Sequence, residues 1–320
     1  MTSAFAKELK YVRRIEIRDD GNLPKMSSMR IPAAIPYLKN LKELYIRDVY
    51  LDDIVKLVRW IPKIEVLWCE NILARGDRNE MLFFTQRLRQ LRKFGLFFSR
   101  ECEFTGCMSL LSTRNNVLPE TLEVLAVSNL YDSENYVITE DIDAMRMDDV
   151  AASMIRRWNI MEESLLTKYR IFSSLRNLRS LTLGQCRSYT ARVWRECFIP
   201  CGKQLEFLSL TGWHDNQSHG LLDTWQNIQP SALSATVNFQ DMIEDVEEAI
   251  ADFLHSIPHL RKLELIDFYC GEGIKQGIRR LSHLQHDVLS TVGFSLSPKT
   301  VDDMYRVMVP KAVILFRPIK

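Results

Sequence analysis

A pair of apolar residues separated by one position recurs along the chain, and this repeat constrains the fold more than any other feature. In the stretch from Leu175 to Leu183, leucines lie at positions 175, 178, 181 and 183. This spacing matches neither the 3.6-residue period of a helix nor the two-residue period of a strand. It predicts a segment that approaches a buried surface, runs along it briefly and turns away. The aligned pairs are Ile15/Ile17, Leu44/Ile46, Leu67/Cys69, Phe94/Leu96, Leu125/Val127, Leu181/Leu183, Leu208/Leu210, Val237/Phe239, Leu263/Leu265 and Val292/Phe294.

The intervals between these pairs are nearly even. Successive pairs begin 23 to 31 residues apart, except for one interval of 56 between Leu125 and Leu181. Most pairs have another apolar residue three positions earlier, whereas Val237/Phe239 has Ser234 there and is the weakest unit. A period in this range with an L-x-x-L-x-L core is typical of leucine-rich repeats.

The chain resembles the ribonuclease-inhibitor-like and F-box-associated leucine-rich repeat proteins over roughly residues 9–296. Their repeats run near this length and often place Cys or Asn just after the strand, where Cys186 and Asn71 lie here. One strand–turn–helix unit cannot bury its apolar face alone, so neighbouring units stack. We expect an α/β leucine-rich repeat solenoid of about ten repeats. This horseshoe has a parallel sheet on its concave side and helices on its convex side.

We expect a single leucine-rich repeat domain over residues 1–320, with an irregular segment at about 130–172. That segment fills the long interval and begins with an acidic run in which only Arg146 is basic. An acidic loop followed by a helical unit is favoured there over a regular repeat. Apolar residues at helical spacing predict helices within 51–62, 81–91 and 243–258. Helices are expected to stop at the Ile-Pro steps 61–62, 199–200 and 257–258, because proline cannot continue a helix.

Charge and composition narrow the class of protein. The formal net charge is +1, which gives no electrostatic reason to expect nucleic acid or an anionic membrane as a partner. No apolar run approaches the ~18 residues of a membrane span, and the first residues lack a signal-peptide core. Seven cysteines without a secretory signal are typical of reduced intracellular thiols. We therefore expect a cytoplasmic or nuclear protein.

Motifs for cofactors and metals are weak. Gly271, Gly273 and Gly277 imitate a dinucleotide-binding loop, but their spacing is not G-x-G-x-x-G, and a strand-to-helix turn explains them. The cysteine pairs 102/107 and 197/201 lack C-x-x-C spacing and a second pair at zinc-site spacing. We expect no cofactor and no metal.

One loop cluster leaves an enzymatic alternative open. His214 and His219 flank Asp215 in a loop just past a strand, which is the best group of polar ligand types in the chain. It has neither a third histidine nor a supporting carboxylate helix nearby. An ordinary loop is the favoured interpretation, and an enzyme with a site near His214 and His219 is the less favoured one.

The residues that alternate with the buried pairs should face the concave side of the sheet. This face is charged and aromatic near the N-terminus and small and hydroxyl-rich in the middle. Either these are ordinary exposed strand positions, or a partner protein or the chain's own acidic segment lies along them. The candidate partner-binding residues are Tyr45, Arg47, Trp68, Glu70, Phe97, Ser128, Thr182, Ser209, Thr211, Asn238 and Glu264.

The predicted function is protein–protein interaction without catalysis. The family resemblance implies a substrate-recognition subunit of a ubiquitin ligase, although no F-box is visible in the sequence. A free-standing scaffold or inhibitor that uses the same face is the alternative. The first repeat begins within about ten residues of Met1, so a partner is also expected at the uncapped N-terminal edge.

Overall fold

The chain folds into two compact units. Unit 1 comprises Met1–Asp132 and Asn177–Thr182, and unit 2 comprises Ser133–Arg176 and Leu183–Lys320. Whether the two units form one domain stays a prediction. The computed structural model describes residues 11–17, 38–72, 88–98, 118–128, 159, 162–163, 166–167, 169–184, 189–213, 239–268, 272–284, 286–290 and 313–314.

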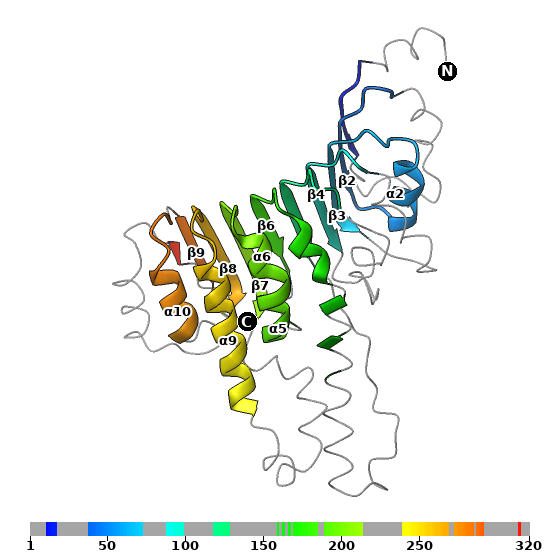
Figure 1. The fold of residues 1–320 in the computed structure, drawn as a ribbon. Coiled ribbons are helices and arrows are strands. Elements are labelled where there is room, and N and C mark those ends of the chain that lie inside the picture. Colours follow the sequence, from blue (N-terminus) through cyan, green and yellow to red (C-terminus); the bar gives the residue numbers. More distant parts are fainter. Residues whose placement is uncertain are drawn as a thin grey trace, which may run out of the picture. The chain divides into compact units, whose positions relative to one another are not determined.

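Unit 1 contains strands whose order in the sheet follows their order in the chain. They are β1 (Arg14–Ile17), β2 (Glu43–Arg47), β3 (Val66–Ile72), β4 (Lys93–Phe98), β5 (Val124–Ser128) and β6 (Ser180–Leu183), the last of which ends in unit 2. Strands β1 to β5 pair in parallel, and the register aligns Leu44, Leu67, Phe94 and Leu125 in one row. Helix α2 (Leu51–Val58) connects β2 to β3 (Figure 1).

Unit 2 also consists of parallel strands joined by helices, and it contains more helical elements than unit 1 among the described residues. Its strands are β7 (Phe207–Trp213), β8 (Lys262–Phe268), β9 (His286–Ser290) and β10 (Val313–Ile314), each paired in parallel with the next. Its helices are η6 (Arg170–Ser174), α5 (Ala191–Val193), η8 (Trp194–Phe198), α6 (Ile199–Gly202), α9 (Phe239–His255) and α10 (Glu272–Arg279). In Figure 1, α6, α9 and α10 form a layer in front of β7, β8 and β9, so the helices cover one face of these strands.

Burial confirms most of the predicted apolar pairs. Every member of seven pairs is at most 2% exposed, which identifies them as the core between sheet and helices. These pairs begin at Leu44, Leu67, Phe94, Leu125, Leu181, Leu208 and Leu263. Ile15 and Ile17 are only partly buried, because β1 has a neighbouring strand on one side only.

A tight turn leads into most of these strands and explains the spacing of three residues. The backbone N–H of Ile64 donates to the carbonyl of Ile61 at 3.2 Å, and the N–H of Leu260 donates to that of Ile257 at 3.4 Å. Both apolar residues of each turn are buried, and the two residues between them are exposed. The turn therefore brings two apolar side chains into the core before the strand begins.

Backbone pairing at the strand starts sets the register in unit 1. The N–H groups of Glu65 and Val66 both donate to the carbonyl of Lys42, at 2.7 and 2.9 Å. The N–H groups of Arg92 and Lys93 make the same pair of bonds to Glu65, at 2.7 and 3.0 Å. Each strand is thereby placed at a fixed position relative to the one before it.

The structure corrects one of the ten predicted repeats, and another lies outside the described residues. At the predicted pair Val237/Phe239, Phe239 is the first residue of α9 and Val237 lies outside the described residues, while β7 pairs directly with β8. The last predicted pair, Val292/Phe294, lies outside the described residues, and the strand falls earlier, at β9. The register puts Asp287 opposite Leu263 and Leu289 opposite Leu265. A search for apolar pairs misses this unit because an aspartate occupies the first position.

Two local predictions also need correction. The helix does not stop at Ile199-Pro200, because α6 includes Pro200 and directly follows the π-helix η8. In the wider turn of the π-helix, the N–H of Ile199 donates to the carbonyl of Trp194. The helix then continues through Pro200, which has no N–H to donate. Asn71 was expected just after the strand, but β3 runs to Ile72, so Asn71 lies within the strand, exposed and with a φ of 51°. The buried position after strand pair Leu67/Cys69 belongs to Ile72, which is 0% exposed.

A leucine in place of Asp287 should stabilise unit 2. The register places position 287 in the row of Leu208 and Leu263, where burial of a leucine contributes about 1–3 kcal/mol. We expect Asp287→Leu to raise the midpoint of thermal unfolding, whereas Leu263→Ala lowers it. A lower midpoint for Asp287→Leu would contradict the register of β9.

Candidate interaction site on the strand face

We use "strand face" for the side chains that alternate with the buried pairs in each unit. In unit 1, Tyr45, Trp68 and Phe97 are partly exposed on this face, and Arg47 and Glu70 are exposed. These residues lie on the three neighbouring strands β2, β3 and β4. The structure thus places the predicted aromatic and charged candidates of the N-terminal strands on one surface.

The other predicted partner-binding residues differ in how exposed they are. Thr182, Thr211 and Glu264 are partly exposed, and the side chain of Ser128 and the residues Asn238, His214 and His219 lie outside the described part. Ser209 was expected to be accessible but is only 3% exposed. Its cross-strand neighbour is Glu264, whose longer side chain extends further from the sheet than a serine does. The short Ser209 side chain is therefore shielded by its neighbours, and Ser209 is not an accessible partner-binding residue.

Trp68 is held in a defined position by three neighbours. The register sets it opposite Gly95, and a Cβ atom added to Gly95 would lie 2.5 Å from Cδ2 and Cε3 of the indole. The Trp68 and Phe97 ring centroids are 5.3 Å apart, within the range of favourable aromatic pairs. The indole N–H donates to Oε1 of Glu70 at 3.0 Å. We call Trp68, Glu70, Gly95 and Phe97 the aromatic shelf.

Tyr45 makes contacts of its own and does not join the shelf. The Arg14 guanidinium lies 4.3 Å from the centre of the Tyr45 ring, a cation–π distance. The Tyr45 hydroxyl donates to Glu43 at 3.4 Å. Burial, followed by the negative charge of Glu43, raises the pKa of Tyr45. Tyr45 is therefore engaged by neighbouring side chains, and the open aromatic surface consists of Trp68 and Phe97.

Gly95 was missed by the sequence analysis, although its signal was present. A glycine inside a strand often marks a place where another group approaches closely. Gly95 lies in the middle of β4, and the approaching group is the Trp68 indole. The repeat alignment puts Trp68 and Gly95 at equivalent positions of successive repeats, but only the structure shows that the indole lies against the glycine.

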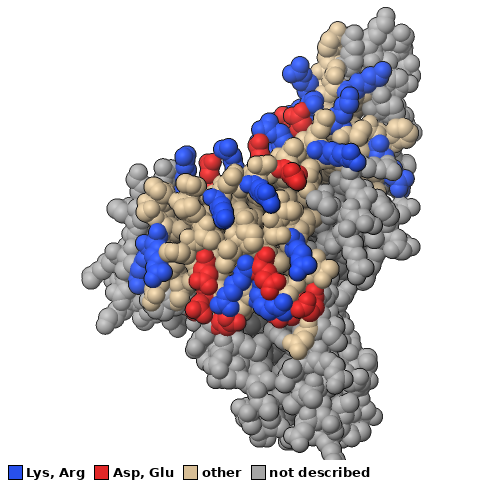
Figure 2. Space-filling view, in the orientation of Figure 1, with Lys and Arg blue, Asp and Glu red and all other residues tan. Residues whose placement is uncertain are grey.

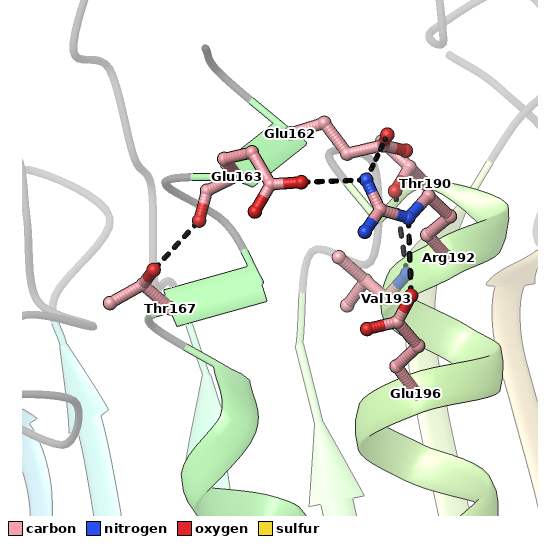
Figure 3. A network of polar contacts seen from close by, with 7 residues as sticks. All are labelled: Glu162, Glu163, Thr167, Thr190, Arg192, Val193 and Glu196. Carbon is pink, nitrogen blue, oxygen red and sulfur yellow. Dashed lines mark hydrogen bonds and ion pairs between the residues drawn. The ribbon is translucent and has the colours of Figure 1, made fainter. Parts of the chain in front are cut away.

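Charges on the helix side of unit 2 pair with one another. Arg192 binds Glu162 at 3.1 Å, Glu163 at 2.8 Å and Glu196 at 3.1 Å (Figure 3). These hydrogen bonds raise the pKa of Arg192, and the bond to Glu163 has the largest effect. They join helical residues 162–163 to the helix that contains Arg192. This network ties elements of the fold together and presents no free cation.

Arg195 makes a second network of the same kind. It lies 2.7 Å from Asp245, 3.4 Å from Glu248 and 3.6 Å from Asp252, which connects η8 to α9. Figure 2 shows Asp or Glu and Lys or Arg side chains alternating across these helices. Because exposed pairs stabilise little individually, the networks mainly orient the helices relative to one another.

The described thiols are buried and protonated. Cys69, Cys197 and Cys201 are free and at most 3% exposed. Burial raises the pKa of Cys69, and it raises the pKa of Cys197 and of Cys201 to about 12. A thiol of such high pKa is a poor nucleophile near neutral pH. Within the residues described, no group of three His, Cys, Asp or Glu side chains could hold a metal ion.

The helices in the described part of the chain are all too short or too polar to cross a membrane.

Comparisons with known proteins give little beyond this description. No family model matches the chain, and no curated protein sequence matches it. Among solved structures, the chain is similar to an internalin from Listeria monocytogenes, with 12% sequence identity and a TM-score of 0.33 over 96% of this chain and 88% of that one. The fold assignment rests on the parallel strands, the helices and the recurring buried leucines, which together have the arrangement of a leucine-rich repeat protein.

The buried thiols predict a specific loss of stability at alkaline pH. The pKa of an unfolded thiol is about 8.5, whereas Cys197 and Cys201 stay protonated in the fold up to about pH 12. Between about pH 8.5 and about pH 12, only the unfolded state releases the protons of these two thiols. The free energy of unfolding should be unaffected by them below about pH 8.5. Above it, the free energy should fall by about 1.4 kcal/mol per pH unit for each thiol.

The comparison of wild type with Cys197→Ala/Cys201→Ala isolates this effect from other alkaline titrations. We expect the double variant to lose stability less steeply above about pH 9, as measured by urea unfolding at several pH values. Parallel pH curves for the two proteins would contradict the burial of the thiols.

A methyl group at position 95 should move Trp68 without unfolding unit 1. Because Trp68 is partly exposed, its ring can rotate away from a Cβ that would otherwise lie 2.5 Å from it. We expect Gly95→Ala to shift the fluorine NMR resonance of 5-fluorotryptophan 68, assigned with Trp68→Phe, while the other tryptophan resonances stay in place. An unchanged Trp68 resonance would contradict the contact.

Proposed function

We propose that this chain is a protein-binding leucine-rich repeat module whose partner docks on the strand face of unit 1, at the aromatic shelf. The observation that carries the proposal is the pair Trp68 and Phe97, partly exposed and 5.3 Å apart on one face of the sheet. Aromatic side chains of this kind are frequent energetic centres of protein interfaces. A partly exposed apolar pair gains free energy when a partner removes it from water.

The rigidity of the shelf supports the same proposal. The Glu70 carboxylate accepts the indole N–H, and the missing side chain at Gly95 lets the ring rest against β4. A side chain that is already held in one position loses little conformational entropy on binding. The shelf is therefore better suited to docking than a freely rotating surface tryptophan.

The proposed role is binding without catalysis. The buried thiols and the internally paired arginines of unit 2 are consistent with that role. The narrower role of a ligase substrate-recognition subunit follows from the family resemblance alone and stays a prediction. A free-standing scaffold or inhibitor would use the same face. Residence in the cytoplasm or nucleus also stays a prediction.

Substitution of the shelf tests the proposal. The full chain, tagged and isolated from its cells of origin, should carry a stoichiometric partner identified by mass spectrometry. Trp68→Ala and Phe97→Ala should each weaken that complex about 30-fold, which corresponds to about 2 kcal/mol for a central aromatic residue. Trp60→Ala is the matched control, because Trp60 is 59% exposed but lies in the turn after α2.

Two results would contradict the proposal: equal affinity for Trp68→Ala and wild type, or a loss caused by Trp60→Ala instead. Circular dichroism of each variant confirms that the fold is kept. A ligase adaptor among the retained proteins would favour the substrate-recognition role, and its absence would favour the scaffold or inhibitor.

A further inference from the structure

Lys93 is the one cation on the strand face of β3 to β5 in the described part of unit 1, and it has no ion-pair partner there. It is exposed at the start of β4, and the register places it between Val66 and Val124, which carry no charge. Glu70 is the acid among the described strand-face residues of β3 to β5, and no ion pair joins it to Lys93; its carboxylate accepts the indole N–H of Trp68. Lys93 therefore presents an uncompensated positive charge beside the aromatic shelf.

Three cations at or just before strand starts of unit 1 have ion-pair partners, unlike Lys93. Arg14 lies 3.8 Å from Glu43, and Lys42 lies 2.6 Å from Glu65. Arg92, the residue before Lys93, lies 2.7 Å from Glu123. These pairs neutralise the surrounding charges within the unit. On the described strand face of β3 to β5, the positive charge available to a partner therefore lies at Lys93.

The spacing along β4 relates this charge to the shelf. Lys93, Gly95 and Phe97 lie on the same side of the strand, because side chains alternate. Positions two apart in a strand are separated by about 6.6–6.8 Å, and the place above Gly95 is taken by the Trp68 indole. Along β4, a partner therefore meets an ammonium group, then an indole, then a phenyl ring.

We propose that the aromatic shelf and Lys93 together recognise an extended polypeptide segment in which an acidic side chain lies two residues from a large apolar one. This proposal rests on the proposed function and specifies its partner. An extended segment repeats the spacing of about 6.6–6.8 Å between alternate side chains, so its apolar group covers Trp68 and Phe97 while its carboxylate reaches Lys93. A segment with a basic side chain in place of the acid is disfavoured, because the two cations would face each other at Lys93.

A displayed library of random peptides, selected on the immobilised full chain, tests the charge preference. We expect the wild-type protein to enrich peptides with Asp or Glu two positions from Trp, Phe, Leu or Met. Lys93→Glu should instead enrich Lys or Arg at the acidic position. Lys63→Glu is the matched control, since Lys63 is exposed in the turn before β3, and it should select the same peptides as wild type.

An enriched peptide is then measured in solution by fluorescence anisotropy. Lys93→Gln should weaken binding up to about fivefold, as expected for one exposed ion pair, and added salt should reduce the difference. Trp68→Ala should weaken the same peptide more strongly than Lys93→Gln does. Replacement of the peptide's acid by its amide should reproduce the Lys93→Gln effect on wild type and have no effect on the variant.

The outcomes separate this inference from the proposed function. If Trp68→Ala abolishes peptide binding but Lys93→Glu selects the same peptides as wild type, the shelf is a docking site and the acidic preference is wrong. If selected peptides bind equally to wild type and Trp68→Ala, the proposed site itself is wrong. Enrichment of basic peptides by the wild-type protein would also overturn the inference.

Discussion

The in-register pairing of parallel strands is the constraint on which the other features depend. Because the starts of β2 to β6 and of β8 each donate two N–H groups to one carbonyl just before the preceding strand, equivalent positions of these repeats come to lie side by side. The alternation of side chains then divides every strand between a buried row and an exposed row. A residue's neighbours are thus set by its position in the repeat.

This arrangement explains both the shelf and the charges around it. Trp68 can lie flat only because the next strand offers Gly95 at the same position. Lys42 and Glu65 form an ion pair because they occupy equivalent positions just before neighbouring strands. Among the described residues Lys93 has no such partner, because the register gives it Val66 and Val124 as neighbours.

Unit 2 uses the same strand plan but relies more on its helix layer. Trp194, Phe198 and Phe253 pack together with ring centroids 5.0 to 6.1 Å apart, which fixes η8 against α9. The N-terminal cap of α5 comes from Thr190, whose side chain accepts the N–H of Val193 (Figure 3). Arg192 and Arg195 add charge pairs at the surface of these helices. Packing and pairing together orient the helices over the strands.

The sequence alone determined the buried rows, because an apolar residue at a repeated position lowers the free energy of the fold wherever the repeats stack. It also located Trp68 and Phe97 on the exposed row, since alternation follows from the strand itself. It failed at Phe239, which an apolar pattern assigns to a strand and the structure to α9, and at Asp287, where a strand position carries a charge. Only the tertiary structure decided that Gly95 supports Trp68, that Ser209 is shielded and that Lys93 has no ion-pair partner in the described part of the chain. Those properties depend on residues from different repeats, and their contacts arise only after the strands have paired.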